Sequence, residues 1–285
     1  LNTPDDSNIC YTLKVDLIYT EECKLKTKDY PLAPERYLPQ ILTPYQNQFN
    51  IKSKIPKLCC TLDNKYNYVV DYRNLKYYIS LGMVVSNVYQ IISYTQSPWL
   101  KVYIDLNTKK RSIGLTEFEK DIWKLMNNAF FGKTMENVRN YQTIDLVTNR
   151  VDFIKMASKA TFKSVTPFSE NLAAVHKYKT IVELNKPIYL GFCILELSKL
   201  HMYKMYYDHI KPIYNDNVEL LYKDTDSFVL NIYTDDLYKD LEDPRWMEVM
   251  DYQKYPKDSK LFKENKNLDI LGKLKDEAEG GLLFN

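Results

Sequence analysis

The sequence has almost no net charge, because its 285 residues include 39 lysines and arginines against 37 aspartates and glutamates, a balance of +2. It therefore lacks the overall basic field that would by itself indicate a nucleic-acid-binding protein, and any such binding has to come from local patches. It also lacks an apolar run of membrane-spanning length and a recognisable signal peptide. For these reasons we expect no membrane partner.

The sequence is equally poor in the patterns that build zinc sites and flexible linkers. Its five cysteines are odd in number, scattered and without zinc-type spacing, which is typical of a reduced, intracellular protein. Repeats, low-complexity segments and glycine-rich linkers are absent, so we expect one compact α/β body with insertions. Because the sequence begins with Leu1 and stops at Asn285 after an apolar run, we expect it to be a piece of a longer protein.

Hydrophobic periodicity predicts alternating strands and helices along the chain. The expected strands cover residues 11–19, 68–70, 84–94, 143–148, 161–167 and 172–178. The expected helices cover residues 72–82, where Gly82 provides the stop, 108–139, and 187–210, where Pro187 stands at the start.

The stretch from Leu220 to Ile232 predicts a tight β-hairpin with four polar residues, Asp224 to Ser227, at its tip. Asp224 and Asp226 repel each other unless a cation lies beside them. A hard divalent ion such as Mg²⁺ takes one or two protein carboxylates and leaves its other positions to water and substrate phosphates. This pattern favours a phosphoryl-transfer metal site, and its alternative is a solvated acidic turn.

The predicted helix at 108–139 carries a second polar constellation. At 100° per residue, Lys120, Lys124, Asn128 and Phe131 share one face, and Gly132 follows where another chain can approach closely. Two unpaired lysines one turn apart favour a polyanion such as a triphosphate, and the aromatic ring can lie against a base.

The opposite arc of this helix is apolar, so we expect it to anchor the helix in the protein; it comprises Phe118, Ile122, Leu125, Met126, Ala129 and Phe130. The alternative interpretation of the polar face is structural. In that case Glu117 and Asp121 neutralise the lysines, and Phe131 belongs to the core.

Both constellations resemble motifs of family B DNA polymerases. Lys124-Leu-Met-Asn-Asn128-Ala-Phe-Phe131-Gly132 is similar to motif B, Lys-x3-Asn-Ser-x-Tyr-Gly, and Tyr222-Lys-Asp224-Thr-Asp226-Ser227 is similar to motif C, Tyr-x-Asp-Thr-Asp-Ser. Further segments resemble, in the same order, the protein-primed polymerases of Maverick/Polinton-type transposons and related viruses: 29–35, 69–75, 96–99, 118–121, 132–137, 184–188, 197–200, 255–258 and 272–277.

The resemblance implies a fold class and a division of the chain. The fold would be α/β, with the antiparallel sheet and packed helices of a polymerase palm plus helical fingers, and incomplete. Residues 1–107 would form a palm segment with a first insertion, 108–139 the fingers helix, 140–186 a second, β-rich insertion, and 187–285 the palm with the motif C hairpin, ending before the thumb.

The resemblance also implies roles for the candidate residues. Asp226 would be the principal metal ligand and Asp224 a supporting carboxylate of a two-Mg²⁺ site. Lys124 would hold the triphosphate with help from Lys120, and the remaining motif B residues, Asn128, Phe131 and Gly132, would line the nascent base pair. The implied partners are a DNA template-primer, deoxynucleoside triphosphates and a priming terminal protein.

Several residues depart from the family pattern. Ala129 and Phe131 stand where motif B has Ser and Tyr, and Lys223 is a long cation beside the two aspartates, which it either crowds or points away from. No motif A carboxylate is present, and we interpret Asp16, its nearest imitation, as structural. We therefore expect a portion of a DNA-directed DNA polymerase that is inactive as an isolated chain. One alternative is a non-catalytic remnant that at most binds nucleic acid. The other is an unrelated metal-dependent nuclease or phosphatase.

Overall fold

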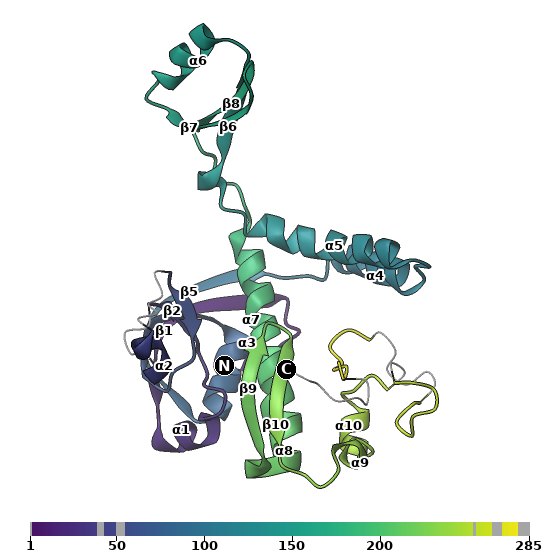
Figure 1. Ribbon diagram of the computed structural model, residues 1–285. Helices are drawn as coiled ribbons and strands as arrows, with labels where there is room; N and C mark the ends of the chain where they lie inside the picture. The colour runs from purple at the N-terminus through teal and green to yellow at the C-terminus, as the bar shows by residue number, and fades with distance from the viewer. Residues whose placement is uncertain (1, 39–42, 50–54, 253–254, 264–269, 279–285) are drawn as a thin grey trace. The chain divides into compact units, whose positions relative to one another are not determined.

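The computed structural model describes residues 2–38, 43–49, 55–252, 255–263 and 270–278 (Figure 1). By its internal contacts the chain divides into two compact units. The first comprises residues 1–102 and 193–285, and the second comprises residues 103–192. Each unit is described separately below.

The first unit is built on a three-stranded antiparallel sheet with β1 (Ile9–Tyr19) between β4 (Lys65–Asp71) and β5 (Met83–Thr95). Helix α3 (Tyr72–Ser80) connects the two outer strands and is capped at its start by the Asp71 carboxylate. It ends before Gly82, whose φ of +104° is a backbone conformation that favours glycine. The predicted strands at 11–19, 68–70 and 84–94 and the predicted helix at 72–82 are confirmed.

The core of this unit is rich in tyrosine. Helix α7 (Ile188–Lys204) enters the unit at Cys193 and continues through a π-helical segment, η2 (Met205–Ile210), into the short helix α8 (Lys211–Tyr214). The predicted helix at 187–210 is therefore confirmed, with a π-helical last part. The rings of Tyr203 and Tyr206 are almost completely buried along this path.

Tyrosine hydroxyls also hold a buried loop that has no regular structure. The backbone carbonyls of Tyr30, Pro31 and Leu32 accept hydrogen bonds at 2.7, 3.0 and 2.9 Å. The donors are Tyr207, Tyr203 and Tyr19, in that order. Because buried carbonyls need partners, these bonds allow the loop to lie in the core.

The remaining elements of the first unit are short. They are α1 (Glu21–Thr27), β2 (Glu35–Tyr37), α2 (Pro44–Gln48), β3 (Lys57–Cys59), β9 (Val218–Asp224), β10 (Ser227–Ile232), α9 (Leu237–Asp240) and α10 (Pro244–Met247), with β2 paired to β3 and β9 to β10. The predicted hairpin at 220–232 is thus present as β9 and β10.

The second unit contains the longer helices α4 (Lys101–Ser112) and α5 (Glu117–Thr134), shorter helical segments and a small sheet. These two helices are followed by η1 (Val138–Asn140), β6 (Gln142–Val147), α6 (Arg150–Ala157), β7 (Phe162–Ser169) and β8 (Leu172–Tyr178). The strands form an antiparallel sheet in the order β6-β8-β7. The three strands expected in this stretch are confirmed.

The prediction of one continuous helix over 108–139 is wrong. The chain turns between α4 and α5, and Thr116 begins the second helix with a capping box. Its hydroxyl accepts from the Glu119 backbone N–H at 3.2 Å, and the Glu119 carboxylate accepts from the Leu115 and Thr116 N–H groups at 2.9 and 3.4 Å. Because these bonds satisfy otherwise unpaired donors, they define a helix start where a continuous helix was expected.

The structure confirms the coarse fold class, a mixed α/β protein with small antiparallel sheets and helices. In the part of the chain that the structure describes, no helix is both long and apolar enough to cross a membrane.

Candidate functional site

The two candidate metal ligands lie at a two-residue hairpin turn, Asp224 directly before it and Asp226 within it. Asp224 ends β9 and pairs in register with Ser227, which begins β10, so Thr225 and Asp226 alone form the connection. The Ser227 hydroxyl donates to the Asp224 carbonyl at 3.0 Å, and the Thr225 hydroxyl donates to Asp224 Oδ1 at 3.0 Å. All four side chains are exposed, so both carboxylates are open to solvent at the end of the hairpin.

The backbone at the tip is strained. Thr225 has a φ of +37°, a region that β-branched residues rarely adopt. A two-residue hairpin turn with positive φ at its first position normally has glycine there. Strain of this kind persists only where the surrounding structure imposes it, and such residues are found most often at functional sites.

Lys223 faces the core and not the aspartates. Successive side chains in a strand point to opposite faces, so Lys223 lies on the other face from Asp224. Its ammonium group is 5.5 Å from the centre of the buried Tyr30 ring. Phe228, which pairs with Lys223 across the hairpin, also contacts Tyr30, and the centroids of these two rings are 6.1 Å apart. Of the two alternatives left open by the sequence, the lysine therefore points away.

Lys223 nevertheless interacts electrostatically with the hairpin tip. Burial lowers the pKa of its ammonium group, and the charge of Lys199 acts in the same direction, whereas Asp224 and Asp226 oppose it. Lys199 itself pairs with the buried Glu196 carboxylate at 2.7 Å. The acidic tip thus has a partly buried cation behind it, which reduces the repulsion between its two carboxylates.

The candidate nucleotide-binding residues lie on α5 in the second unit. Lys120 forms an ion pair with Glu117 at 2.8 Å, as the structural alternative expected. Lys124 and Asn128 are exposed, and Phe131 is half-buried. A Cβ atom added to Gly132 would meet nothing within 4 Å, so the helix surface there is open.

The expected anchoring face of α5 is wrong. Phe118 is 74% exposed and Leu125 64% exposed, and Ile122 and Met126 are also exposed. Of the expected face, Phe130 does contact α4, since its ring centre is 6.2 Å from that of Tyr103. The other contact with α4 comes from Asn127, which lies outside the expected face.

Asn107 and Asn127 are positioning residues that the sequence analysis missed. Asn107 is almost completely buried, and its side-chain amide donates to Asn127 Oδ1 at 2.7 Å. This contact fixes the register between α4 and α5, because a shift would leave the buried Asn107 amide without its partner. The sequence contained one signal for this contact. Asn127 is a second asparagine next to Asn128, on a helix whose apolar residues are spread around its circumference and so do not define one buried side.

The interpretation of Asp16 as structural is confirmed. This carboxylate is buried and accepts three hydrogen bonds, from the Asn67 backbone N–H at 2.7 Å, the Asn87 amide at 3.0 Å and the Tyr89 hydroxyl at 2.6 Å. These bonds, that of Tyr89 first, lower its pKa. Asp16 therefore joins β1 to both neighbouring strands.

The structure divides the candidate residues between the two units. Asp224 and Asp226 lie together in the first, whereas Lys120, Lys124, Asn128, Phe131 and Gly132 lie in the second. Two exposed carboxylates at one hairpin turn are hard oxygen donors and fit the few protein ligands that Mg²⁺ takes. Within the described ranges, no group of three or more histidine, cysteine, aspartate or glutamate side chains could hold a metal ion.

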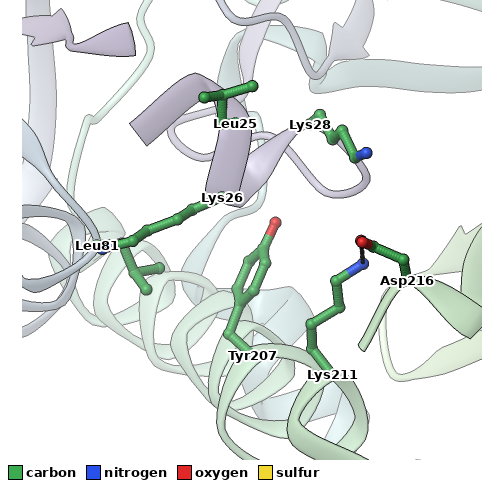
Figure 2. Close-up of a pocket in the computed structure, with 7 residues that line it drawn as sticks. All are labelled: Leu25, Lys26, Lys28, Leu81, Tyr207, Lys211 and Asp216. Carbon is green, nitrogen blue, oxygen red and sulfur yellow. Dashed lines mark ion pairs between the residues drawn. The ribbon is translucent and has the colours of Figure 1, made fainter. Parts of the chain in front are cut away.

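The first unit also has a lysine-lined cavity of about 450 Å³ between α1 and η2–α8 (Figure 2). Lys26 pairs with Glu22 at 2.6 Å, and Lys211 pairs with Asp29 at 2.6 Å and with Asp216 at 3.8 Å. Because these two lysines are already neutralised, we assign no anion site to this cavity.

No family model, curated protein or solved structure matches this chain. The interpretation of the site therefore depends on its own residues and on the two sequence motifs.

Proposed function

We propose that this chain is the palm and fingers portion of a protein-primed family B DNA polymerase. The observation that carries the proposal is the motif C-like segment from Tyr222 to Ser227, which forms the tip of a tight hairpin at which Asp224 and Asp226 are both exposed. A strained Thr225 between the two carboxylates supports a functional interpretation of the turn.

Asp226 is the principal metal ligand in this proposal, and Asp224 is the supporting one. Two bound Mg²⁺ ions would supply activation of a primer 3′-hydroxyl and stabilisation of the leaving pyrophosphate. The exposed position of the two carboxylates leaves room for substrate phosphates beside them. Lys223 supports the site from behind by anchoring the hairpin to Tyr30.

The residues of α5 bind the incoming deoxynucleoside triphosphate and the nascent base pair. Lys124 is the main phosphate contact, because its exposed ammonium group has no ion pair among the described residues, and Lys120 assists after release from Glu117. Asn128, Phe131 and the open backbone at Gly132 contact the base-pair side. The proposed partners are a DNA template-primer and a priming terminal protein.

Asp16, the described residue that most resembles a second catalytic carboxylate, is engaged in structural hydrogen bonds. Two-metal nucleotidyl transfer needs carboxylates that hold both ions. We therefore propose that the isolated 285-residue chain binds DNA and triphosphate but does not extend a primer, and that extension requires the full-length gene product.

Primer extension by the full-length gene product tests the proposal. Asp226→Asn should abolish extension while fluorescence anisotropy shows unchanged binding of primer-template DNA, because the amide keeps the shape and loses the charge. Asp235→Asn is the matched control, since Asp235 is also exposed in the same unit and lies outside the hairpin. Its extension rate should equal that of the wild-type protein.

Three results are informative against the proposal. Undiminished extension by Asp226→Asn would end the assignment of Asp226. DNA binding without any extension by the wild-type full-length protein would favour the alternative, a non-catalytic nucleic-acid-binding protein. Templated extension by the isolated chain would refute the need for a further carboxylate strand.

A further inference from the structure

Two cysteines that are far apart in the sequence meet inside the first unit. Cys10 lies in β1 and is 1% exposed, and Cys193 lies in α7 and is half-buried. The two thiols are hydrogen-bonded to each other, and Tyr94 of β5 hydrogen-bonds both of them, with 2.8 Å between its Oη and Cys193 Sγ. Neither cysteine belongs to the proposed polymerase site.

Charged groups surround this pair on the α3 side. Arg73 Nη2 donates to Cys10 Sγ at 3.1 Å and is held by Gln96 Oε1 at 2.7 Å. Asp71 Oδ2 lies 3.6 Å from Cys10 Sγ, which donates to it while protonated. The thiol pair thus lies beside a fixed guanidinium group, a setting that stabilises a thiolate.

The two thiols differ in acidity. The hydrogen bond with Cys193 is the largest cause that lowers the pKa of Cys10, and those with Tyr94 and Arg73 act in the same direction against burial and Asp71. The hydrogen bond with Cys10, followed by burial, raises the pKa of Cys193. This difference favours Cys10 as the thiolate and Cys193 as the thiol of the pair.

The other cysteines lack these features. Cys23 is buried beside Thr27, and burial raises the pKa of its thiol. Cys60 is exposed but its pKa is also raised, first by burial of the sulfur. A metal site is not an alternative for the Cys10 cluster within the described residues, where no group of three potential ligands occurs.

We propose that Cys10 and Cys193 are a peroxide-reactive dithiol, with Cys10 as the attacking thiolate and Cys193 as the resolving thiol. The geometry that carries this is the pair of fixed contacts around the two thiols, which are hydrogen-bonded to each other: Arg73 Nη2 lies 3.1 Å from Cys10 Sγ, and Tyr94 Oη lies 2.8 Å from Cys193 Sγ. The proposal requires that hydrogen peroxide, a small oxidant, reach a Cys10 sulfur that is 1% exposed, past the half-buried Cys193.

The reaction has two balanced steps. Cys10 sulfur attacks one oxygen of the peroxide, the O–O bond breaks, and the other oxygen leaves as hydroxide and takes a proton to become water. Cys193 sulfur then attacks the Cys10 sulfenic sulfur, the S–O bond breaks, and hydroxide leaves with the Cys193 proton as a second water. The two thiols lose two electrons, and one peroxide becomes two waters. The new bond joins β1 covalently to α7.

The test is controlled oxidation of the 285-residue chain with one equivalent of hydrogen peroxide, followed by alkylation and peptide mass spectrometry. We expect a disulfide-linked pair of peptides that contain Cys10 and Cys193, with Cys23 alkylated only after unfolding. In Cys193→Ser the sulfenic acid cannot be resolved, so dimedone should label Cys10. Cys23→Ser is the matched control and should still form the Cys10–Cys193 disulfide.

Tyr94→Phe separates a chemical role from a structural one. It removes one hydrogen bond to the thiolate and keeps the ring, so oxidation of Cys10 should become several-fold slower while the circular dichroism spectrum stays unchanged. The proposal is overturned if peroxide leaves the Cys10 and Cys193 peptides reduced in the folded wild-type chain, or if it oxidises only Cys59 and Cys60. The wild-type measurement decides even if the serine variants do not fold.

Discussion

The ammonium group of Lys223 lies 5.5 Å from the centre of the Tyr30 ring, whereas the next residue, Asp224, is exposed at the tip of the same hairpin. The alternation of side chains along β9 accounts for this separation. Tyr30 belongs to the loop whose carbonyls accept tyrosine hydroxyls, so the hairpin is attached to a rigid part of the core. Lys223 therefore does not crowd the two aspartates; it attaches the hairpin to the core.

Lys223→Met should change the free energy of unfolding by less than about 1 kcal/mol. The cation–π contact contributes roughly 0.5–1 kcal/mol, and removing a partly buried charge offsets part of that loss. Urea unfolding of the chain measures the change. Lys257→Met, at an exposed position, provides the baseline for replacing a surface lysine. A loss of several kcal/mol would mean that Lys223 does more than anchor the hairpin.

Thr225→Gly should stabilise the hairpin, because glycine adopts positive φ without a steric penalty. Strained residues of this type cost roughly 1–3 kcal/mol, and the extra backbone entropy of glycine offsets part of the gain, so we expect an increase of about 1 kcal/mol in the free energy of unfolding. Chemical denaturation measures it. Thr234→Gly, in the loop after β10, should instead be destabilising or neutral.

The same change has a functional consequence under the polymerase proposal. A relaxed turn holds Asp224 and Asp226 less firmly, so Thr225→Gly should weaken Mn²⁺ binding, measured by calorimetry, while it raises stability. Tighter Mn²⁺ binding in the more stable variant would contradict the view that the strain helps to position the carboxylates.

Regular alternation made most of the fold predictable. The strands at β1, β5 and the hairpin follow from runs of apolar and β-branched residues, and Gly82 marks the end of α3 in the sequence itself. The residues of the capping box, Thr116 and Glu119, could also be recognised in the sequence as a possible helix start, but the helical periodicity on both sides of them favoured one long helix. A local side-chain hydrogen bond outweighed that periodicity.

The orientation of α5 was not predictable from its own residues. The side that faces α4 is set by the hydrogen bond between Asn107 and Asn127. A helical wheel of α5 cannot show this contact, because Asn107 belongs to another helix. The candidate site was only partly predictable for a similar reason. The positions of Asp224 and Asp226 follow from the local pattern, whereas the direction of Lys223 depends on Tyr30, which lies in a distant loop.

Asp16→Asn should lower stability at neutral pH and make it less sensitive to acid. The folded-state pKa of Asp16 is lowered, so its contribution is present above the unfolded pKa and is lost as the pH falls through the folded value. Urea midpoints at about pH 7 and about pH 3 measure this difference, since the unfolded pKa is about 3.9. Asp6→Asn, at an exposed position, should leave both midpoints unchanged. An unchanged midpoint in Asp16→Asn at neutral pH would contradict the structural role.

Alkaline pH should unfold the chain earlier than its net charge suggests. Burial raises the pKa of Tyr214 and Tyr252 to about 12, and it raises the pKa of Tyr203 well above the ordinary range. Raised pKa values mean that the stability is present below the unfolded pKa and is lost above about pH 10, at about 1.4 kcal/mol per pH unit for each tyrosine. Urea midpoints between about pH 8 and pH 11 measure the slope. Tyr203→Phe should reduce it, and a flat profile in the wild-type protein would refute the prediction.

Gly132→Ala separates the stability of α5 from its proposed role in binding. Alanine is favoured over glycine in a helix by about 1 kcal/mol, and the added Cβ meets nothing within 4 Å, so the free energy of unfolding should rise by up to about 1 kcal/mol. If a base pair or template approaches this backbone, the same methyl group should weaken binding of primer-template DNA in fluorescence anisotropy. Gly191→Ala is the contrasting variant, since its Cβ would overlap the Met135 side chain, and we expect it to be destabilised. Higher stability with unchanged DNA affinity in Gly132→Ala would remove Gly132 from the proposed site.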